Sequence, residues 1–396
     1  MKPGFSSRTR WELTENALER ARRELRASGA DTVDLTVTNP TRVGLARLRE
    51  LRAVLDGLGD ASYAPEPLGM SGTREAIARH LLADEDIHAD PSAMFLSAST
   101  SEAYAWLFKL LCDPGDDVLI PTPSYPLFGW LAGLESVVVR PYSLVREERF
   151  RVDLGALERA IGPRTRAIVT VSPNNPTGTF LHPDDARAID ALASAHGLAV
   201  IADEVFRTFP LEPASPGRSC AGEREALTFV LDGLSKRCAS PGLKLAFTCA
   251  FGPAELVRAA LARLEVIADT YLSVATPIGL GLPACLSAER SIRAEIDARL
   301  RRNLATLDAA MERRGAALGA QRLRVEGGWS VIVEAPRTEP DAERAMRALV
   351  RHGVLVHPGW FFDMEREGSL VLSLLPEAER FEAGVERLLD AIEAAG

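Results

Sequence analysis

Short, continuously apolar segments alternate with helical segments through the central part of the chain. We expect strands at residues 94–98, 118–121, 137–141, 167–171, 198–202, 227–231 and 245–251. Strands that are apolar on both faces are typical of a parallel sheet that helices cover on both sides. The pattern therefore predicts an α/β fold with a large, mostly parallel, seven-stranded sheet.

The N-terminal part has a different pattern. Residues 11–28 show the spacing of an amphipathic helix, and residues 34–38 predict a short strand that Pro40 ends. Residues 72–82 predict a further helix, with Thr73 as its N-cap. These segments indicate an N-terminal arm that leads into the large domain.

The C-terminal part predicts a small α+β domain. Residues 288–315 are periodic and rich in Arg, Glu, Ala and Leu, which predicts one long linking helix. After it, strands are expected at residues 323–326, 329–334, 354–357 and 370–374, with helices at 341–352 and 377–395. We therefore divide the chain into an N-terminal arm with part of the small domain (1–45), a large domain (46–287), and a linking helix with the C-terminal small domain (288–396).

Composition limits the classes of function. The chain has 396 residues, of which 46% are hydrophobic and 26% charged, and a net charge of −9 disfavours a general affinity for nucleic acid. Five scattered cysteines without a Cys-x-x-Cys pair argue against a structural zinc site and a disulfide framework. The chain lacks a signal-peptide pattern and any run of about 18 apolar residues, so we expect a cytoplasmic protein without a membrane segment.

Three residues near predicted strand ends indicate a cofactor site. Asp203 follows Asn175 by 28 residues, and Lys236 follows Asp203 by 33. A lysine can form an imine with the aldehyde of pyridoxal 5′-phosphate (PLP), an aspartate can keep its pyridine nitrogen protonated, and an asparagine amide can donate to its phenolic oxygen. Taken singly, Asp203 would more often be a helix N-cap and Lys236 a solvated surface residue, so the prediction depends on the whole set.

With this set, the chain resembles the class I/II aminotransferases of PLP fold type I over nearly its whole length. The resemblance implies that Lys236 in Ser235-Lys236 holds the cofactor and that Lys244 in Gly242-Leu243-Lys244 binds its phosphate. The family has an arginine at the latter position. A lysine keeps the positive charge but loses the bidentate geometry.

Other segments resemble further parts of the family's cofactor site. Ser99, Thr100 and Ser101 open a predicted helix and match its phosphate-binding cup, although simple helix capping is the alternative. Tyr125 matches the aromatic residue that stacks on the pyridine ring. Tyr63 resembles the tyrosine that reaches the phosphate in the neighbouring subunit, which implies a homodimer with shared active sites.

The sequence departs from the family at three positions. Phe206 stands where a tyrosine commonly donates to the phenolic oxygen, so a raised imine pKa is expected, and Gly233 replaces a phosphate-binding serine. Val371 occupies the place of the arginine that grips the substrate α-carboxylate. Asn39 and Arg42, in a segment expected over the site, are therefore candidate substrate-binding residues, and Arg366 is a second candidate for the missing guanidinium.

The resemblance implies an aminotransferase that moves an amino group between an amino acid and a 2-oxo acid. Lys236 would also shuttle the proton as general acid and base. Phe206 and Val371 leave open a PLP-dependent lyase or a cyclising synthase on the same scaffold. A non-catalytic PLP-binding regulator is a third hypothesis, which the absence of a basic patch disfavours.

Overall fold

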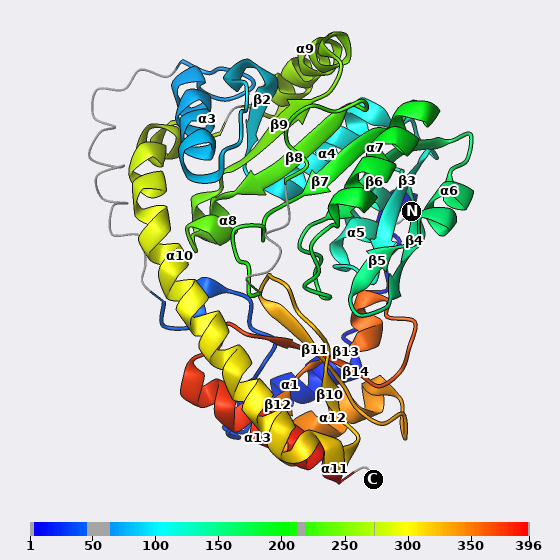
Figure 1. Ribbon diagram of the computed structural model, residues 1–396, viewed down its shortest axis with the longest axis vertical. Coiled ribbons are helices and arrows are strands. Elements are labelled where there is room, and N and C mark those ends of the chain that lie inside the picture. Colours follow the sequence, from blue (N-terminus) through cyan, green and yellow to red (C-terminus); the bar gives the residue numbers. More distant parts are fainter. Residues whose placement is uncertain (1–3, 46–63, 213–218, 273, 395–396) are drawn as a thin grey trace.

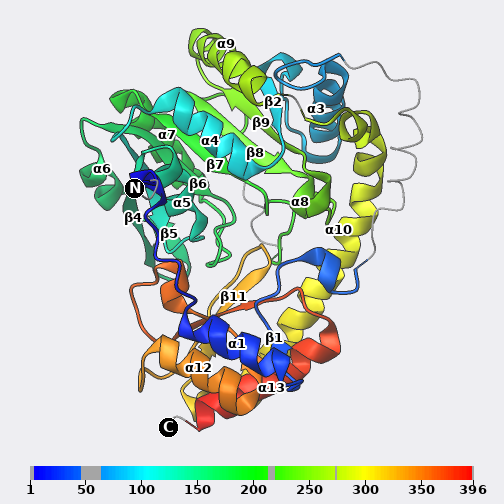
Figure 2. The same ribbon diagram turned by 180° about the vertical axis from the view of Figure 1, so that it is seen from behind.

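The computed structural model describes residues 4–45, 64–212, 219–272 and 274–394. Figure 1 shows two lobes, each built around one of two larger sheets, with the long helix α10 (Thr276–Ala310) running beside both. We call them the large-sheet lobe and the small-sheet lobe. The N-terminal helix α1 (Ala17–Ala27) packs on the small-sheet lobe, as Figure 2 shows from behind.

The large sheet has eight strands in the order β2-β9-β8-β7-β6-β3-β4-β5. They are β2 (Met94–Ser97), β3 (Asp117–Thr122), β4 (Val138–Arg146), β5 (Phe150–Val152), β6 (Thr165–Val171), β7 (Ala199–Asp203), β8 (Thr228–Gly233) and β9 (Ala246–Phe251). All seven expected strands are present. The eighth, β5, forms an antiparallel hairpin with β4 and was missed because three residues carry too little pattern.

Helices cover both faces of the large sheet because its central strands are apolar on both sides. In β7, Val200 packs into the cluster on one face and Ile201 into the cluster on the other, as the alternation of a strand requires. One face carries α4 (Thr100–Leu111), α5 (Leu127–Leu134) and α9 (Ala254–Tyr271), and the other carries α6 (Leu154–Ala160) and α7 (Pro183–His196). The predicted doubly covered parallel sheet is confirmed, with β9 antiparallel to its neighbours.

The small sheet has four antiparallel strands in the order β10-β11-β14-β13. They are β10 (Gln321–Arg322), β11 (Ser330–Glu334), β13 (His357–Pro358) and β14 (Ser369–Ser373), and the lobe also holds α12 (Asp341–His352) and α13 (Ala378–Glu393). A separate parallel pair joins β1 (Val33–Asp34) to β12 (Val354–Leu355). This pair ties the N-terminal segment to the C-terminal lobe.

The remaining helical elements complete the described chain. They are the 3-10 helices η1 (Ser7–Thr9), η2 (Pro40–Arg42), η3 (Pro91–Ala93), η4 (Pro241–Leu243) and η6 (Gly359–Phe362), the π-helical turn η5 (Met311–Gly315), and the α-helices α3 (Ser71–Glu85), α8 (Leu234–Arg237) and α11 (Ala316–Leu318).

The prediction that Thr73 caps a helix is wrong. Helix α3 begins two residues earlier, and the carboxylate of Glu66 accepts from the backbone N–H of Ser71 at 2.9 Å. Thr73 is buried inside the helix, where its hydroxyl donates to the carbonyl of Gly279 in α10 at 3.0 Å. The threonine joins two helices instead of starting one.

Two other boundaries differ from the prediction. The linking helix starts at Thr276 and continues through Pro283, well before the predicted residue 288. Residues 323–326 form no strand, because the backbone N–H groups of Glu326 and Gly327 donate to the carbonyl of Gly178 in the large-sheet lobe. These backbone hydrogen bonds attach the segment to the large-sheet lobe.

No single helix of the described ranges is long and apolar enough to cross a bilayer; only the bent pair formed by residues 254–271 and 276–318 passes that test, on length and composition alone.

Candidate active site

The three predicted cofactor residues follow three neighbouring parallel strands. Strand β7 pairs in parallel with β6 on one side and with β8 on the other. Asn175 lies just beyond β6, Asp203 ends β7, and Lys236 lies just beyond β8. The structure therefore brings all three to the carboxyl edge of the sheet, where open α/β sheets bind ligands.

The carboxylate of Asp203 is held by two hydrogen bonds. The hydroxyl of Tyr104 on α4 donates to Oδ2 at 3.2 Å, and the backbone N–H of Val205 donates to Oδ1 at 3.2 Å. Burial raises the pKa of Asp203 to about 6, against the effect of these donors. Tyr104 was not recognised from the sequence as part of the site, because its role depends on a residue 99 positions away.

The amine of Lys236 lies between two aromatic rings. Its Nζ is 5.1 Å from the ring centre of Phe206 and 5.1 Å from that of Trp329. Burial lowers the pKa of Lys236 to about 8, while the negative charge of Asp203 acts in the opposite direction. A lysine with such a pKa loses its proton readily near neutral pH, as a nucleophilic amine must.

Trp329 is a site residue that the sequence reasoning missed. It comes from the small-sheet lobe, directly before β11, and is 1% exposed. Its ring packs edge-on against Phe206 at 5.3 Å and against Phe209 at 5.2 Å. The sequence showed it only as part of a strand, since nothing local indicates that it reaches the other lobe.

Asn175 connects the two lobes. The hydroxyl of Ser330 in β11 donates to Asn175 Oδ1 at 3.2 Å. This bond leaves the amide nitrogen of Asn175 as the group available to donate to a ligand oxygen, which is the role expected for it.

The predicted phosphate-binding residues gather at the start of α4. Ser99 is the N-cap, and its hydroxyl accepts from the backbone N–H of Glu102 at 3.2 Å, so the capping expected as the alternative is present. Thr100 and Ser101 occupy the first helical turn and are partly exposed. A capped helix start with accessible hydroxyls can still hold a phosphate, because the serine keeps its own proton to donate.

Lys244 lies close to this helix start through the sheet. The ends of β2 and β8 meet the start of β9, because Ser97 and Gly233 both pair with Ala246. Lys244 precedes β9, is exposed, and has the left-handed backbone with φ 56°. A side chain at Gly233 would meet the backbone of Ala246 at 2.9 Å, so this turn excludes the family's serine.

The remaining predicted residues lie in different surroundings. Ser235 is partly buried on α8, and Tyr125 lies beyond β3 with 46% of its surface exposed. Asn39 caps η2, where its side-chain oxygen accepts from the N–H of Thr41 at 3.0 Å, and Arg42 at the end of η2 is exposed. Tyr63 lies outside the described residues.

Val371 lies in an apolar cluster between the lobes. It is 2% exposed and packs with Leu323, Ile332 and Phe362 of the small-sheet lobe and with Phe150 of the large sheet. The packing around residue 371 therefore suits the valine and not the arginine that the family has at this position.

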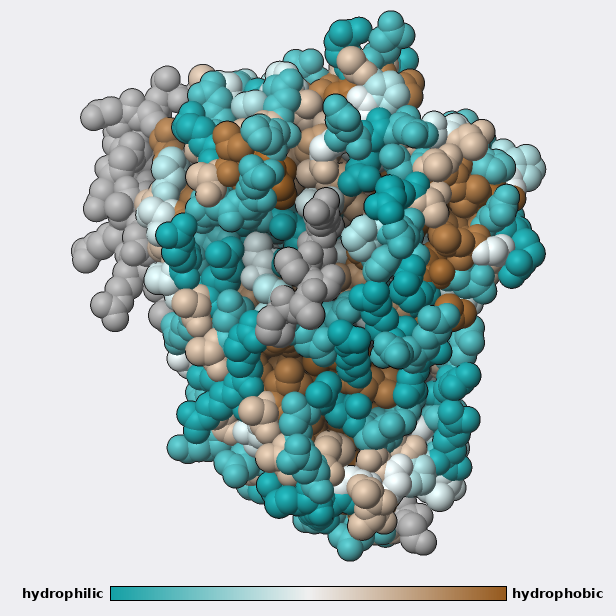
Figure 3. Space-filling model, viewed as in Figure 1, coloured by the Kyte–Doolittle hydropathy of each residue, from teal (hydrophilic) through white to brown (hydrophobic). Residues whose placement is uncertain are grey.

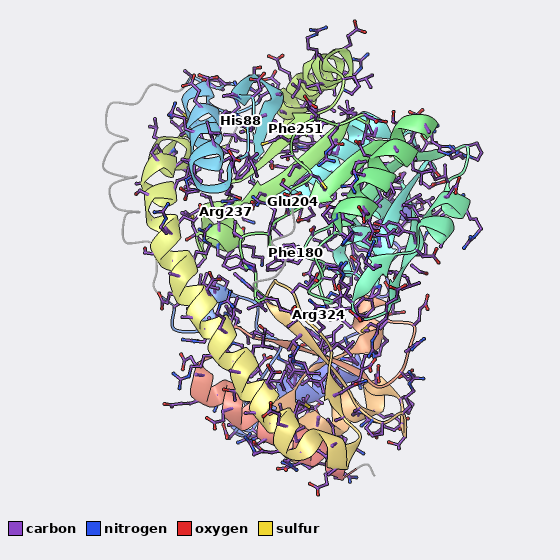
Figure 4. The ribbon with its side chains drawn as sticks, viewed as in Figure 1. His88, Phe180, Glu204, Arg237, Phe251 and Arg324 are labelled. Carbon is purple, nitrogen blue, oxygen red and sulfur yellow. The ribbon has the colours of Figure 1, made fainter. Side chains whose placement is uncertain are left out.

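A buried ionic cluster lies behind the lysine and the aspartate. Arg237 forms ion pairs with Glu85 at 2.6 Å, Asp232 at 2.8 Å and Glu289 at 3.0 Å. Arg207 pairs with Glu85 and, at 2.9 Å, with Glu204. Figure 4 labels Arg237 on α8 and Glu204 just beyond β7. The residues that follow Lys236 and Asp203 in the chain thus belong to one network.

These residues fit PLP. A lysine with a lowered pKa, a partly buried carboxylate that pairs with no arginine of the described ranges, an asparagine amide and a helix start with hydroxyls lie at one sheet edge. The carboxylate would be stabilised by a protonated pyridine nitrogen, which would remove the cost of its burial. The donor set therefore matches the three polar ends of the cofactor.

Comparisons with known proteins show the family of the chain. The family profile "Aminotransferase class I and II" matches residues 48–392. An aspartate/prephenate aminotransferase of Thermus thermophilus is 30% identical over 369 residues, which cover 92% of each chain. A solved aspartate aminotransferase of the same organism, a double mutant, has a TM-score of 0.83 at 26% identity and covers 98% of this chain and 100% of its own.

The fold agrees equally well with a more distant structure. An alanine aminotransferase from Pyrococcus furiosus has a TM-score of 0.87 at 23% identity, with 99% of this chain and all of its own covered. The chain therefore belongs to the class I and II aminotransferases, the PLP-dependent enzymes of fold type I that transfer amino groups.

Proposed function

We propose that this aminotransferase holds PLP through Lys236 and uses the same amine to move the proton during transfer. When bound, the cofactor supplies an aldehyde carbon and an electron-withdrawing ring. Asp203 keeps a positive charge on that ring, and the amide of Asn175 donates to its phenolic oxygen. The observation that carries the proposal is the position of Lys236, Asp203 and Asn175 at the carboxyl ends of three neighbouring parallel strands.

Lys236→Ala tests this assignment. We expect the purified variant to lose both steady turnover and the absorbance of lysine-linked cofactor, because no other amine replaces it. Lys109→Ala is the matched control, since that lysine is exposed in the last turn of α4 and pairs with Glu135. Steady turnover by Lys236→Ala would refute the role of Lys236.

For the phosphate we propose Ser99, Thr100, Ser101 and Lys244. The start of α4 offers backbone N–H groups and the positive end of the helix dipole, and Lys244 adds a full charge. Ser235 is assigned to the same end because it precedes the lysine on α8. Tyr125 is proposed to stack on the ring, and its exposed side chain is free to turn over a ligand.

For the substrate carboxylate we propose Arg42, with Asn39 in the same segment. The segment lies against the end of the small sheet, because Ser373 donates to the carbonyls of Leu35 and Val37. Figure 2 shows this segment, in a lighter blue than α1, between α10 and β11 on the side facing α8. Within the described ranges Arg42 forms no ion pair, so its guanidinium is available.

Arg42→Ala should raise the apparent KM for the amino donor by about 10-fold or more, the value of one charge-assisted hydrogen-bond pair. Arg366→Ala is the matched control, because Arg366 is also exposed and is the second candidate. An unchanged KM in Arg42→Ala with a raised KM in Arg366→Ala would transfer the role to Arg366.

The donor and acceptor are found with a panel of amino acids and amines mixed with the holoenzyme. Aspartate and alanine, which the names of related enzymes mention, are suitable first members. A transaminase releases a 2-oxo acid and leaves the cofactor in its amine form after a single turnover. A lyase or cyclising synthase would return the cofactor to its aldehyde form, which distinguishes the alternative.

We further propose a cytoplasmic homodimer, with the chain divided at residues 45 and 287. Support for the dimer comes from large apolar side chains that are exposed on and after α9 and at the start of α10. They are Leu256, Val266, Tyr271, Leu272 and Leu280. A second copy of the chain would cover such a surface.

A further inference from the structure

The position of the Lys236 amine is defined by aromatic rings and not by hydrogen bonds. Its Nζ lies 5.1 Å from the ring centre of Phe206 and 5.1 Å from that of Trp329, and no residue of the described ranges forms a hydrogen bond with it. A ring face attracts an ammonium group within about 6 Å of its centre, and more strongly when water is excluded. Two such faces act on Lys236.

None of the described charged groups near the amine weakens the attraction of the Lys236 ammonium to the two rings. Asp203, on β7, is the charged group whose field acts on Lys236. The neighbouring Glu204, Arg207 and Arg237 are occupied in the buried ionic cluster. The ammonium is thus balanced by one carboxylate and two aromatic faces.

The two rings come from different lobes and pack edge-on against each other at 5.3 Å. Phe206 follows β7 in the large-sheet lobe, whereas Trp329 is supplied by the segment before β11. That segment is pinned across the seam, since Gly327 N–H donates to Gly178 and Gly328 N–H donates to Phe209, both at 2.9 Å. A side chain at Gly327 would meet Phe180 at 2.7 Å, which keeps the approach close.

We propose that Phe206 and Trp329 form an aromatic clamp that holds the Lys236 ammonium between the lobes whenever the lysine is not bonded to the cofactor. The inference rests on the proposed role of Lys236. During amino transfer the lysine is displaced and must stay near the reacting carbon to move a proton. The clamp gives the displaced amine a defined place, and it makes Trp329 a positioning residue supplied by the small-sheet lobe.

The clamp is tested by titrating Lys236 in the full chain stripped of cofactor. The probe is reductive methylation with formaldehyde and cyanoborohydride at a series of pH values, with methylation of the Lys236 peptide measured by mass spectrometry. Trp329→Leu removes one ring face and keeps an apolar side chain. We expect the apparent pKa of Lys236 to fall by about one pH unit, the value of one cation–π contact.

Two further variants distinguish the loss of a ring from a general disturbance of the fold. Phe206→Leu removes the other face and should lower the pKa of Lys236 in the same direction, while Trp329→Phe retains a ring and should lower it less. The matched control is Trp130→Leu, which removes an indole that is 48% exposed and packs on Trp11. Unchanged or raised pKa values in both leucine variants, or an equal fall in the control, would overturn the clamp.

This outcome is separable from that of the proposed function. The titration needs neither cofactor nor substrate, so a negative result removes the clamp and leaves the spectral test of Lys236→Ala as it stands. Conversely, a wild-type chain that forms no lysine-linked absorbance with PLP would disprove the proposed function, whatever the lysine titration gives.

Discussion

At the residue scale, Asp203 is placed where burial works against its charge. Its ordinary pKa is 3.8, and burial raises the pKa of Asp203 to about 6 in the folded chain without cofactor. Between these values folding takes up a proton, so its contribution to stability falls as the pH rises through about 6. Above that pH the folded chain carries the full cost of the buried charge.

Asp203→Asn should therefore stabilise the chain without cofactor above pH 6, by roughly 1–2 kcal/mol, and by less near pH 4. The amide keeps one oxygen that can accept from the Val205 N–H, and its NH2 group can donate to the hydroxyl oxygen of Tyr104. Urea unfolding at several pH values measures the effect. The matched control is Asp86→Asn, at an exposed position; a gain that does not grow with pH would contradict the assigned cause. With PLP bound, the same substitution should weaken the complex.

The apolar surroundings of Val371 predict the effect of placing a charged side chain at this position. Restoring the family's arginine with Val371→Arg should not restore a carboxylate grip, because the surrounding side chains from Phe150, Ile332 and Phe362 are apolar. An unpaired charge there should lower the Tm and cost about 3 kcal/mol or more. Thermal unfolding measures this, with Val350→Arg as the exposed control. A variant with unchanged Tm and a lowered donor KM would show that the cluster opens to substrate.

The sequence predicted the residues that stand in recognisable motifs and missed those that act across the fold. Asn175, Asp203 and Lys236 each follow an apolar strand, so their convergence at one sheet edge follows from parallel topology alone. Tyr104 and Trp329 sit in segments whose local pattern describes only a helix and a strand. Their contacts with Asp203 and Lys236 depend on tertiary packing.

At the element scale, α8 is a helix of four residues that carries Lys236 and cannot be stable by itself. Its last residue, Arg237, is 0% exposed and is paired with carboxylates on α3, β8 and α10. Buried ion pairs contribute little to net stability but fix geometry when intact. We infer that the ionic cluster fixes the position of this short helix, and therefore of Lys236, relative to β7.

Arg237→Ala should cost roughly 3–5 kcal/mol in the free energy of unfolding, because it leaves Asp232, Glu85 and Glu289 without their central cation. Arg290→Ala provides the matched control. Its ion pair with Asp84 has an arginine side chain that is 76% exposed, and its loss should cost less than about 1 kcal/mol. Equal costs for the two variants, measured by urea unfolding, would show that the cluster does not anchor α8.

Among the elements, long periodic segments were predictable and short ones were not. Helix α12 occupies the predicted residues 341–352, since its apolar stripe is clear from the sequence. Residues 354–357 were expected to form one strand but divide into β12 and β13, which belong to different sheets. A two-residue strand is set by its partners, and these lie far away in the chain.

At the scale of the whole molecule, polar contacts join the lobes around the site. Glu326 of the small-sheet lobe accepts from the backbone N–H of Phe180 at 2.9 Å and pairs with Arg149 at 3.0 Å. Figure 4 shows Phe180 and Arg324 on either side of this seam, and Figure 3 shows apolar surface along it. Because Asn175 also bonds to Ser330 across the seam, a shift of one lobe would move a cofactor residue.

The proposed dimer with shared active sites can be tested by mixing two inactive variants. If Tyr63 completes the site of the neighbouring subunit, each site takes Lys236 from one chain and Tyr63 from the other. Tyr63→Ala and Lys236→Ala then remove residues that different chains contribute to a site. A hybrid dimer then has one site with native residues at both positions, because the lysine comes from one chain and the tyrosine from the other. Mixing the two inactive variants under conditions of subunit exchange should recover roughly a quarter of the native sites.

The control for complementation is a mixture of Lys236→Ala with Asp203→Ala. Both residues lie at the edge of the same sheet in one chain, so each hybrid site lacks one of them and no activity should return. Sedimentation of the wild type should show a dimer. A monomeric wild type, or an inactive mixture of dimers that exchange subunits, would mean that each chain builds its site alone and that Tyr63 serves another purpose.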